Sequence, residues 1–111
     1  MPPRLTADFW VRAYLARLAQ AGIPAFVVAH GDDTAGAVLV KLSTLDGAAW
    51  ALHRIFDPLS GGRRWITLAE GPEAGVDAAI ARECGRDPDL WVIEIEDRNG
   101  RTLLDQPGLD E

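Results

Sequence analysis

Apolar residues recur at intervals of three and four near the N-terminus, which is the spacing of one face of a helix. These residues are Trp10, Val11, Tyr14, Leu15 and Leu18. Thr6 stands before them as a candidate N-cap, while Gly22 and Pro24 follow them as stop signals. The pattern predicts a helix over residues 7–21 with one apolar stripe.

Four short apolar segments, separated by residues typical of turns, then predict strands. They cover residues 24–30, 36–44, 48–56 and 64–69. The third segment is rich in alanine, so its composition also suits a helix. The Asp46-Gly47 pair before it is a strong hairpin signal, and this signal favours a strand.

Residues 71–85 predict a second helix. Pro72 stands near its start and Gly85 at its end, which is the usual placement of these two residue types. Its apolar stripe consists of Val76, Ala79, Ile80 and Cys84.

The alternating residues 90–97 predict a fifth strand. Asn99-Gly100 is a candidate type I′ turn, with residues 101–104 as a candidate return strand. Residues 105–111 are expected to form a frayed tail.

In chain order the expected elements are a helix, four strands, a helix, and a strand or hairpin. Runs of consecutive strands favour antiparallel pairing, because hairpins join neighbours in sequence. The chain is therefore expected to form a single α+β domain over residues 1–111. It should contain a mostly antiparallel sheet of about five strands and two helices.

A two-residue loop at Asp46-Gly47 would place Lys41, Trp50, Leu52 and Arg54 on one face of the sheet. The other face would then hold His53, with Trp65 among its apolar residues, whereas Arg64 would join Arg54. Neither face is cleanly polar, as a sheet with one wet face should be. This excess of apolar surface implies either a helix over each face or an interface with a second copy or another protein.

Glu94 and Glu96 alternate with Trp91, Ile93 and Ile95 along the fifth strand, so the two carboxylates share one face. They are expected to pair with Lys41, Arg54 and Arg64 across the sheet, because opposite charges on neighbouring strands attract. A catalytic or metal-binding pair is the alternative, and it would need a third ligand or a nucleophile nearby.

The formal net charge of -6 argues against a general binder of nucleic acids or anionic membranes, which needs clustered positive charge. A single cysteine, Cys84, excludes an internal disulfide and a cysteine-based zinc cluster. The apolar stretch from Phe9 to Ala29 is interrupted by charged residues and a proline, so it does not suit a membrane span. We expect a cytoplasmic protein.

His30, Asp32 and Asp33 lie together in one turn, and imidazole with carboxylates can bind a divalent metal. The spacing matches no recognised metal motif, and aspartate with glycine commonly serves a turn. We therefore predict no metal site. Cys84 lies late in the second helix on its apolar stripe, which favours an inert buried thiol.

The loop from Ser60 to Trp65 reads SGGRRW and combines free backbone amides, two arginines and an indole. That composition suits an anion or a stacked ring, although most loops of this kind only connect strands. We take four residues as a candidate anion- or ligand-binding cluster: His53, Arg54, Arg63 and Arg64. Trp50 and Trp65 are candidate interface anchors.

No nucleophile elbow, Cys-x-x-Cys pair, zinc-protease motif or phosphate-binding loop occurs in the sequence. No catalytic residue and no cofactor are predicted. The first hypothesis is a binding or protein-interaction module without catalysis, with a second copy or another protein as partner. The alternative is a small enzyme or a binder of an anionic small molecule that uses the arginine and histidine cluster.

Several segments together resemble a known family. They read LTADFWVRAYLARL, GIPAFVVAHGDDTAGAVLVKLSTLDG, RRWITLAEG and DPDLWVIEIEDRNGRTLL. In this order they resemble the short alphaproteobacterial proteins grouped as domain of unknown function 1491. The resemblance covers nearly the whole chain and implies a small bacterial protein, but it implies no catalytic residue, ligand or partner.

Overall fold

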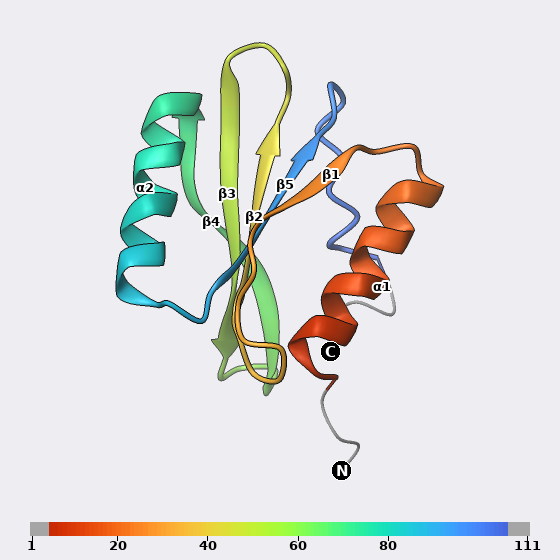
Figure 1. The fold of residues 1–111 in the computed structure, drawn as a ribbon, viewed down its shortest axis with the longest axis vertical. Coiled ribbons are helices and arrows are strands. Elements are labelled where there is room, and N and C mark those ends of the chain that lie inside the picture. The colour runs from red at the N-terminus through yellow and green to blue at the C-terminus, as the bar shows by residue number, and fades with distance from the viewer. Residues whose placement is uncertain (1–4, 107–111) are drawn as a thin grey trace.

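The structure is a computed structural model that describes residues 5–106 (Figure 1). Its elements follow the predicted order. They are α1 (Ala7–Gln20), β1 (Ala25–Ala29), β2 (Val38–Ser43), β3 (Ala48–Asp57), β4 (Gly62–Pro72), α2 (Glu73–Arg86) and β5 (Trp91–Glu96). The α+β class and the choice of strand for the alanine-rich segment are confirmed.

The five strands form one sheet in the order β1-β5-β2-β3-β4. β5, the last strand in sequence, lies between β1 and β2, antiparallel to the first and parallel to the second. The other neighbours are antiparallel. Helix α2 joins the edge strand β4 to β5 and so returns the chain to the middle of the sheet.

The two helices lie on opposite faces of the sheet (Figure 1). The α1 side holds the larger apolar cluster, made chiefly of Trp10, Val11, Tyr14, Leu18, Val38, Val40, Leu42, Trp91, Ile93 and Ile95. The α2 side holds the smaller cluster, made of Leu39, Ala49, Ala51, Val76, Ile80, Leu90 and Val92. The apolar excess on both faces is therefore explained by a helix over each face.

The connection between β2 and β3 is one residue longer than the predicted two-residue loop. Ser43 pairs with Ala49, and the Thr44 amide donates to the Ala48 carbonyl at 3.4 Å, which leaves residues 45–47 as the loop. The Asp46 carboxylate accepts hydrogen bonds from the Thr44 hydroxyl and the Ala48 amide at 2.6 and 3.1 Å. These bonds favour the longer loop.

A shift of one residue exchanges the faces of a strand, so the predicted sharing of a face by Lys41 with Trp50, Leu52 and Arg54 is wrong. Leu42 lies opposite Trp50, and Val40 lies opposite Leu52, on the α1 side. Lys41 lies opposite Ala51 on the α2 side.

The β3–β4 hairpin also differs from the prediction by one residue. Asp57 pairs with Gly62, which leaves the four residues 58–61 as the loop. Arg54 consequently lies opposite Trp65 on the α1 side, whereas His53 lies opposite Ile66 on the α2 side. The prediction had placed Trp65 with His53 and Arg64 with Arg54.

The predicted return strand at residues 101–104 is also wrong. The Asp97 carboxylate accepts three hydrogen bonds from Arg101, one from the amide and two from the guanidinium, at 2.7 to 3.1 Å. Tyr14 donates its hydroxyl hydrogen to the Thr102 carbonyl at 2.7 Å, and Leu104 is buried in the α1-side cluster. The segment therefore turns onto α1 instead of pairing with β5.

The expected frayed tail lies mostly outside the described residues, which end at residue 106. Within residues 5–106, no helix is long and apolar enough to cross a bilayer.

Lys41 is a buried charge on the α2 side of the central strand β2. Its ammonium lies 2.9 Å from a Glu73 oxygen, 2.7 Å from Asp77 and 3.5 Å from Glu94. The expected pairing of Glu94 with Lys41 is confirmed, but Arg54 lies on the opposite face and takes no part. Three partly exposed carboxylates from α2 and β5 thus compensate the buried cation.

Burial acts to lower the pKa of Lys41, but hydrogen bonds to Asp77 and Glu73 and the charge of Glu94 raise that pKa above its usual value. The ammonium is therefore charged at neutral pH and holds α2 against β2 and β5.

We predict that Lys41→Met lowers the free energy of unfolding by about 1–3 kcal/mol, because three neighbouring carboxylates lose their cation. The loss should stay below that of a fully buried pair, since the carboxylates remain partly hydrated. Arg82→Met, which removes an exposed cation from α2, should change this free energy by less than about 0.5 kcal/mol. Urea unfolding measures both, and equal losses in the two variants would contradict the assignment.

The stabilisation by Lys41 should also depend on pH in a defined window. Its pKa is higher in the folded chain, so its contribution is complete below the unfolded pKa of about 10.4 and is lost as the pH rises further. The stability difference between the wild type and Lys41→Met should therefore be equal at about pH 7 and pH 9 and smaller at about pH 11. If the stability difference between the two proteins already shrinks between about pH 7 and pH 9, this account is contradicted.

Candidate functional site

A groove opens on the α1 side of the sheet, where α1 leaves part of β3 and β4 uncovered. Its first section is a cavity of about 350 Å³ lined by Leu52, Arg54, Arg63, Arg64, Trp65, Thr102, Leu104 and Asp105. Its second section, of about 320 Å³, is lined by Leu42, Thr44, Trp50, Leu52, Gly100 and Thr102. Because Leu52 and Thr102 line both sections, we treat them as one site, the arginine–tryptophan groove.

The floor of the groove is apolar and its far wall is the segment after β5. Leu52 and Trp65 pack against the α1-side cluster from the strands, and Leu104 belongs to that cluster. Each section alone has a volume typical of small-molecule sites, which range from about 300 to 1,000 Å³. The site therefore has room for a ligand that extends along β3.

Arg54 is held at the junction of α1 and the groove by two indoles. Its guanidinium carbon lies 4.8 Å from the ring centre of Trp10 and 5.3 Å from that of Trp65. The two indoles are themselves 5.7 Å apart. Stacking on both rings limits the motion of the guanidinium and partly removes it from water, which strengthens its interactions with an anion.

Positive charge gathers at this end of the groove. Arg54, Arg63 and Arg64 all line the first section, and Asp105 is the acidic residue in the same lining. The Arg64 guanidinium reaches Asp57 only at 4.0 Å, and its side chain is 63% exposed. Such a pair is weak. Arg64 lies opposite Ile55, so its side chain leaves β4 on the face opposite to Trp65 and reaches the groove only at the edge of the sheet.

The Trp65 indole N–H is buried and has no hydrogen-bond acceptor in the part of the chain that the structure describes. Most buried donors in proteins are satisfied, and an unmet one costs about 1–3 kcal/mol. The N–H has almost no surface open to solvent, so a bound molecule reaches it only if neighbouring side chains move. Trp50, in the second section, differs because its indole N–H donates to Glu70 at 3.0 Å.

The structure brings together most of the residues that the sequence singled out. Arg54, Arg63, Arg64 and Trp65 line the first section of the groove, and Trp50 lines the second. His53 does not line the groove, because it points to the opposite face of β3 from Arg54. It shares a separate cavity of about 140 Å³ with Arg54 and Arg63, and the lining of that cavity also includes Leu39 and Glu83.

Sequence reasoning missed the partners that complete the groove. Trp10 was assigned to the apolar stripe of the first helix, which is correct, but its contact with Arg54 had no sequence signal. Thr102 and Leu104 were assigned to a return strand. Only the tertiary bond from Tyr14 places them against the groove.

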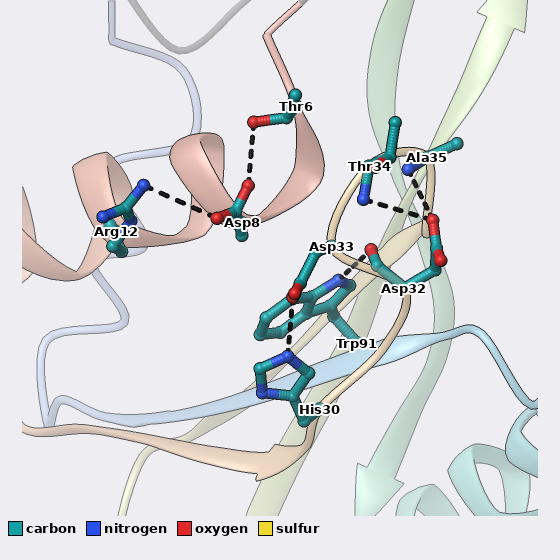
Figure 2. Close-up of polar contacts among 9 residues, drawn as sticks. All are labelled: Thr6, Asp8, Arg12, His30, Asp32, Asp33, Thr34, Ala35 and Trp91. Carbon is teal, nitrogen blue, oxygen red and sulfur yellow. Dashed lines mark hydrogen bonds and ion pairs between the residues drawn. The ribbon is translucent and has the colours of Figure 1, made fainter.

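The turn that carries His30, Asp32 and Asp33 serves the fold (Figure 2). The His30 Nε2 atom lies 2.7 Å from Asp33, and the imidazole stacks on Trp91 with ring centres 4.0 Å apart. The Asp32 carboxylate accepts hydrogen bonds from the amides of Thr34 and Ala35 at 3.1 and 2.8 Å. Within residues 5–106, no three metal-binding side chains gather at one point.

The same turn also fixes the start of α1. The amides of Ala7 and Asp8 donate to the carbonyls of Thr34 and Asp33 at 3.1 and 2.9 Å. Thr6 holds the N-cap position but donates its hydroxyl hydrogen to Asp8 rather than capping the helix. The turn therefore positions the first turn of α1, and with it the indole that stacks on Arg54.

Two helices against a five-stranded sheet, with a groove on the side of α1, describe a small α+β protein. The chain belongs to the family described as "Protein of unknown function (DUF1491)", which matches residues 5–105. The predicted resemblance is confirmed. No curated protein matches the sequence.

Solved structures of the same family share the fold. The crystal structure of a DUF1491 family protein from Caulobacter crescentus is 39% identical, with a TM-score of 0.84, and the match covers 94% of this chain and 98% of that one. An NMR structure of a DUF1491 family protein from the same organism is 38% identical, with a TM-score of 0.81. The match covers 96% of this chain and 97% of that one. Protein Atu0922 from A. tumefaciens is 31% identical with a TM-score of 0.73, over 95% of this chain and 98% of that one.

We predict that Tyr14→Phe lowers the free energy of unfolding by about 1–2 kcal/mol, because the Thr102 carbonyl loses its buried donor. Thr67→Val, which removes an exposed hydroxyl from β4, should stay within about 0.5 kcal/mol of the wild type. Amide hydrogen exchange should also accelerate at residues 102–104 in the first variant alone. Unchanged exchange there would show that Tyr14 does not hold the wall of the groove.

Proposed function

We propose that the protein is a non-catalytic binding module whose arginine–tryptophan groove takes a ligand with an anionic group and an apolar body. The observation that carries this proposal is the convergence of Arg54 and Arg63, with Arg64 at the edge of β4, on an apolar floor that includes the Trp65 indole. A carboxylate or phosphate supplies several acceptor oxygens at once, so one such group can accept hydrogen bonds from more than one guanidinium.

The two sections of the groove support a division of roles. The anionic group would lie in the first section beside Arg63 and Arg64. The apolar body would then lie over Leu52 and reach toward Trp50 in the second section. We therefore propose that Trp50 and Trp65, both half-buried, contact the ligand and do not anchor a flat protein interface.

The chemistry of the lining favours binding over catalysis. Among the described residues that line the groove, the side chains are guanidiniums, indoles, leucines, hydroxyls and one carboxylate. The Thr102 hydroxyl accepts a hydrogen bond from the Leu104 amide at 3.3 Å. An activated nucleophile would need a base beside it, and the lining places none beside Thr102. We also propose that the protein acts in the cytoplasm, which its single, partly buried Cys84 supports.

We predict that anilinonaphthalene sulfonate, an aromatic probe with one anionic group, binds the wild type with a rise in fluorescence. The double variant Arg63→Gln, Arg64→Gln should bind it at least about tenfold more weakly, because two charge-assisted hydrogen bonds are lost. Arg82→Gln removes an exposed cation from α2, across the sheet, and should bind the probe as the wild type does.

A neutral probe separates the two parts of the proposed recognition. Phenylnaphthylamine has a similar aromatic body without the sulfonate, so its affinity should be low and the same in all three proteins. If the sulfonate probe binds the double variant and the wild type equally, the arginines do not recognise anions. If it fails to bind the wild type, the groove is not a site for this ligand class.

A further inference from the structure

Strand β1 forms one edge of the sheet and is apolar along its whole length. It pairs with β5 on one side only. Three consecutive side chains are exposed, with Phe26 at 51%, Val27 at 42% and Val28 at 60%. No charged residue occurs from Ile23 to Ala29.

The opposite edge of the sheet, β4, is built differently. It carries Arg63, Arg64 and Glu70, ends at Pro72, and has an irregular register against β3. Charges, proline and irregularities are the usual devices that stop an edge strand from pairing with another chain. β4 has all three. β1 also has an irregular register, between Val27 and Ala29, but it carries no charge and no proline, which indicates an edge suited to pairing.

The backbone of β1 has a defined outward side. The Glu96 amide donates to the Pro24 carbonyl at 3.0 Å, so this opposed pair is a hydrogen-bonded one. Antiparallel ladders alternate between bonded and non-bonded pairs. Val27, three residues after Pro24, therefore directs its N–H and C=O away from β5, toward the free edge.

We propose that a second copy of this chain pairs with that edge, β1 against β1 in antiparallel orientation, with the two-fold axis at Val27. In this register Val27 faces the partner's Val27, and their outward backbone groups form a mutual hydrogen-bonded pair. Phe26 of each copy lies beside the partner's Val28, and Ala25 lies opposite the partner's Ala29.

The sequence of β1, AFVVA, favours a second copy of this chain as the partner of this edge. It reads nearly the same in both directions, so each aromatic ring meets a β-branched side chain and each alanine meets an alanine. A two-fold contact needs such self-complementarity. The paired strands carry no charge, so no like charges face each other directly across them.

The size of the contact sets its strength. Two five-residue strands bury well under the roughly 1,200 Å² of a standard interface. The dimer should therefore be reversible, with a dissociation constant on the order of 100 µM. Its residues are separate from those of the arginine–tryptophan groove, so this inference stands or falls independently of the proposed function.

Analytical ultracentrifugation of the full chain from about 10 µM to about 1 mM, around the expected dissociation constant, tests the proposal. The weight-average mass of the wild type should rise from 12.0 kDa toward twice that value. Val28→Lys should remain at the monomer mass, because a lysine on each strand opposes pairing. Leu59→Lys places the same charge on the β3–β4 loop, where the side chain is 97% exposed, and should associate as the wild type does.

Hydrogen exchange at the Val27 amide identifies the surface that associates. In the wild type this amide should become protected as the concentration rises, and in Val28→Lys it should not. Phe26→Lys serves as the second variant if Val28→Lys fails to fold. A wild type that stays at the monomer mass throughout, or one whose mass rises without protection of Val27, would overturn the proposal.

Discussion

The buried ammonium of Lys41 is the interaction on which the arrangement of the molecule depends. A charge in the interior is costly unless it is paired, and Lys41 is paired with carboxylates from two other elements, α2 and β5. α2 touches the sheet mainly over β3 and β4, whereas Lys41 is on β2. The ion pairs therefore tie the start of α2 to the central strands and close that face.

With one face closed by α2, the ligand-sized space lies on the other. α1 is held at its start by the turn at residues 30–36 and along its length by Tyr14 and its apolar stripe. It covers the apolar residues of β2 and β5 but leaves Trp50, Leu52 and Trp65 only half-buried. The groove is the part of the sheet that neither helix covers, and Arg54 marks its border with α1.

The order and type of the elements could be predicted because each depends on local patterns. The apolar spacing of α1, the alternation in β5 and the turn before β3 are all visible in neighbouring residues. The faces of the strands could not be predicted, because they depended on the Asp46 side chain accepting two hydrogen bonds and so lengthening a loop by one residue. That residue moved Arg54 to the α1 side, away from Lys41, and the β3–β4 loop, one residue shorter than predicted, placed it opposite Trp65.

The position of β5 between β1 and β2 could not be predicted from the sequence either, since a parallel pair joins strands that are far apart in the chain. The composition of the loop from Ser60 to Trp65 drew attention to two of the arginines that line the groove. It could not show that His53 points to the other face or that Thr102 closes the groove. Those facts depend on register and on one tertiary hydrogen bond.

The central claim is that the groove recognises an anion through its arginines, beside the Trp65 indole. The most direct measurement follows the indole N–H resonances of the four tryptophans by NMR while phenyl phosphate is added. The account predicts that the Trp65 resonance shifts, because the phenyl ring binds against the Trp65 indole. The resonance of Trp91, whose N–H donates to the Asp32 carbonyl at 2.8 Å outside the groove, should stay in place. An unmoved Trp65 resonance at millimolar phenyl phosphate would contradict the account.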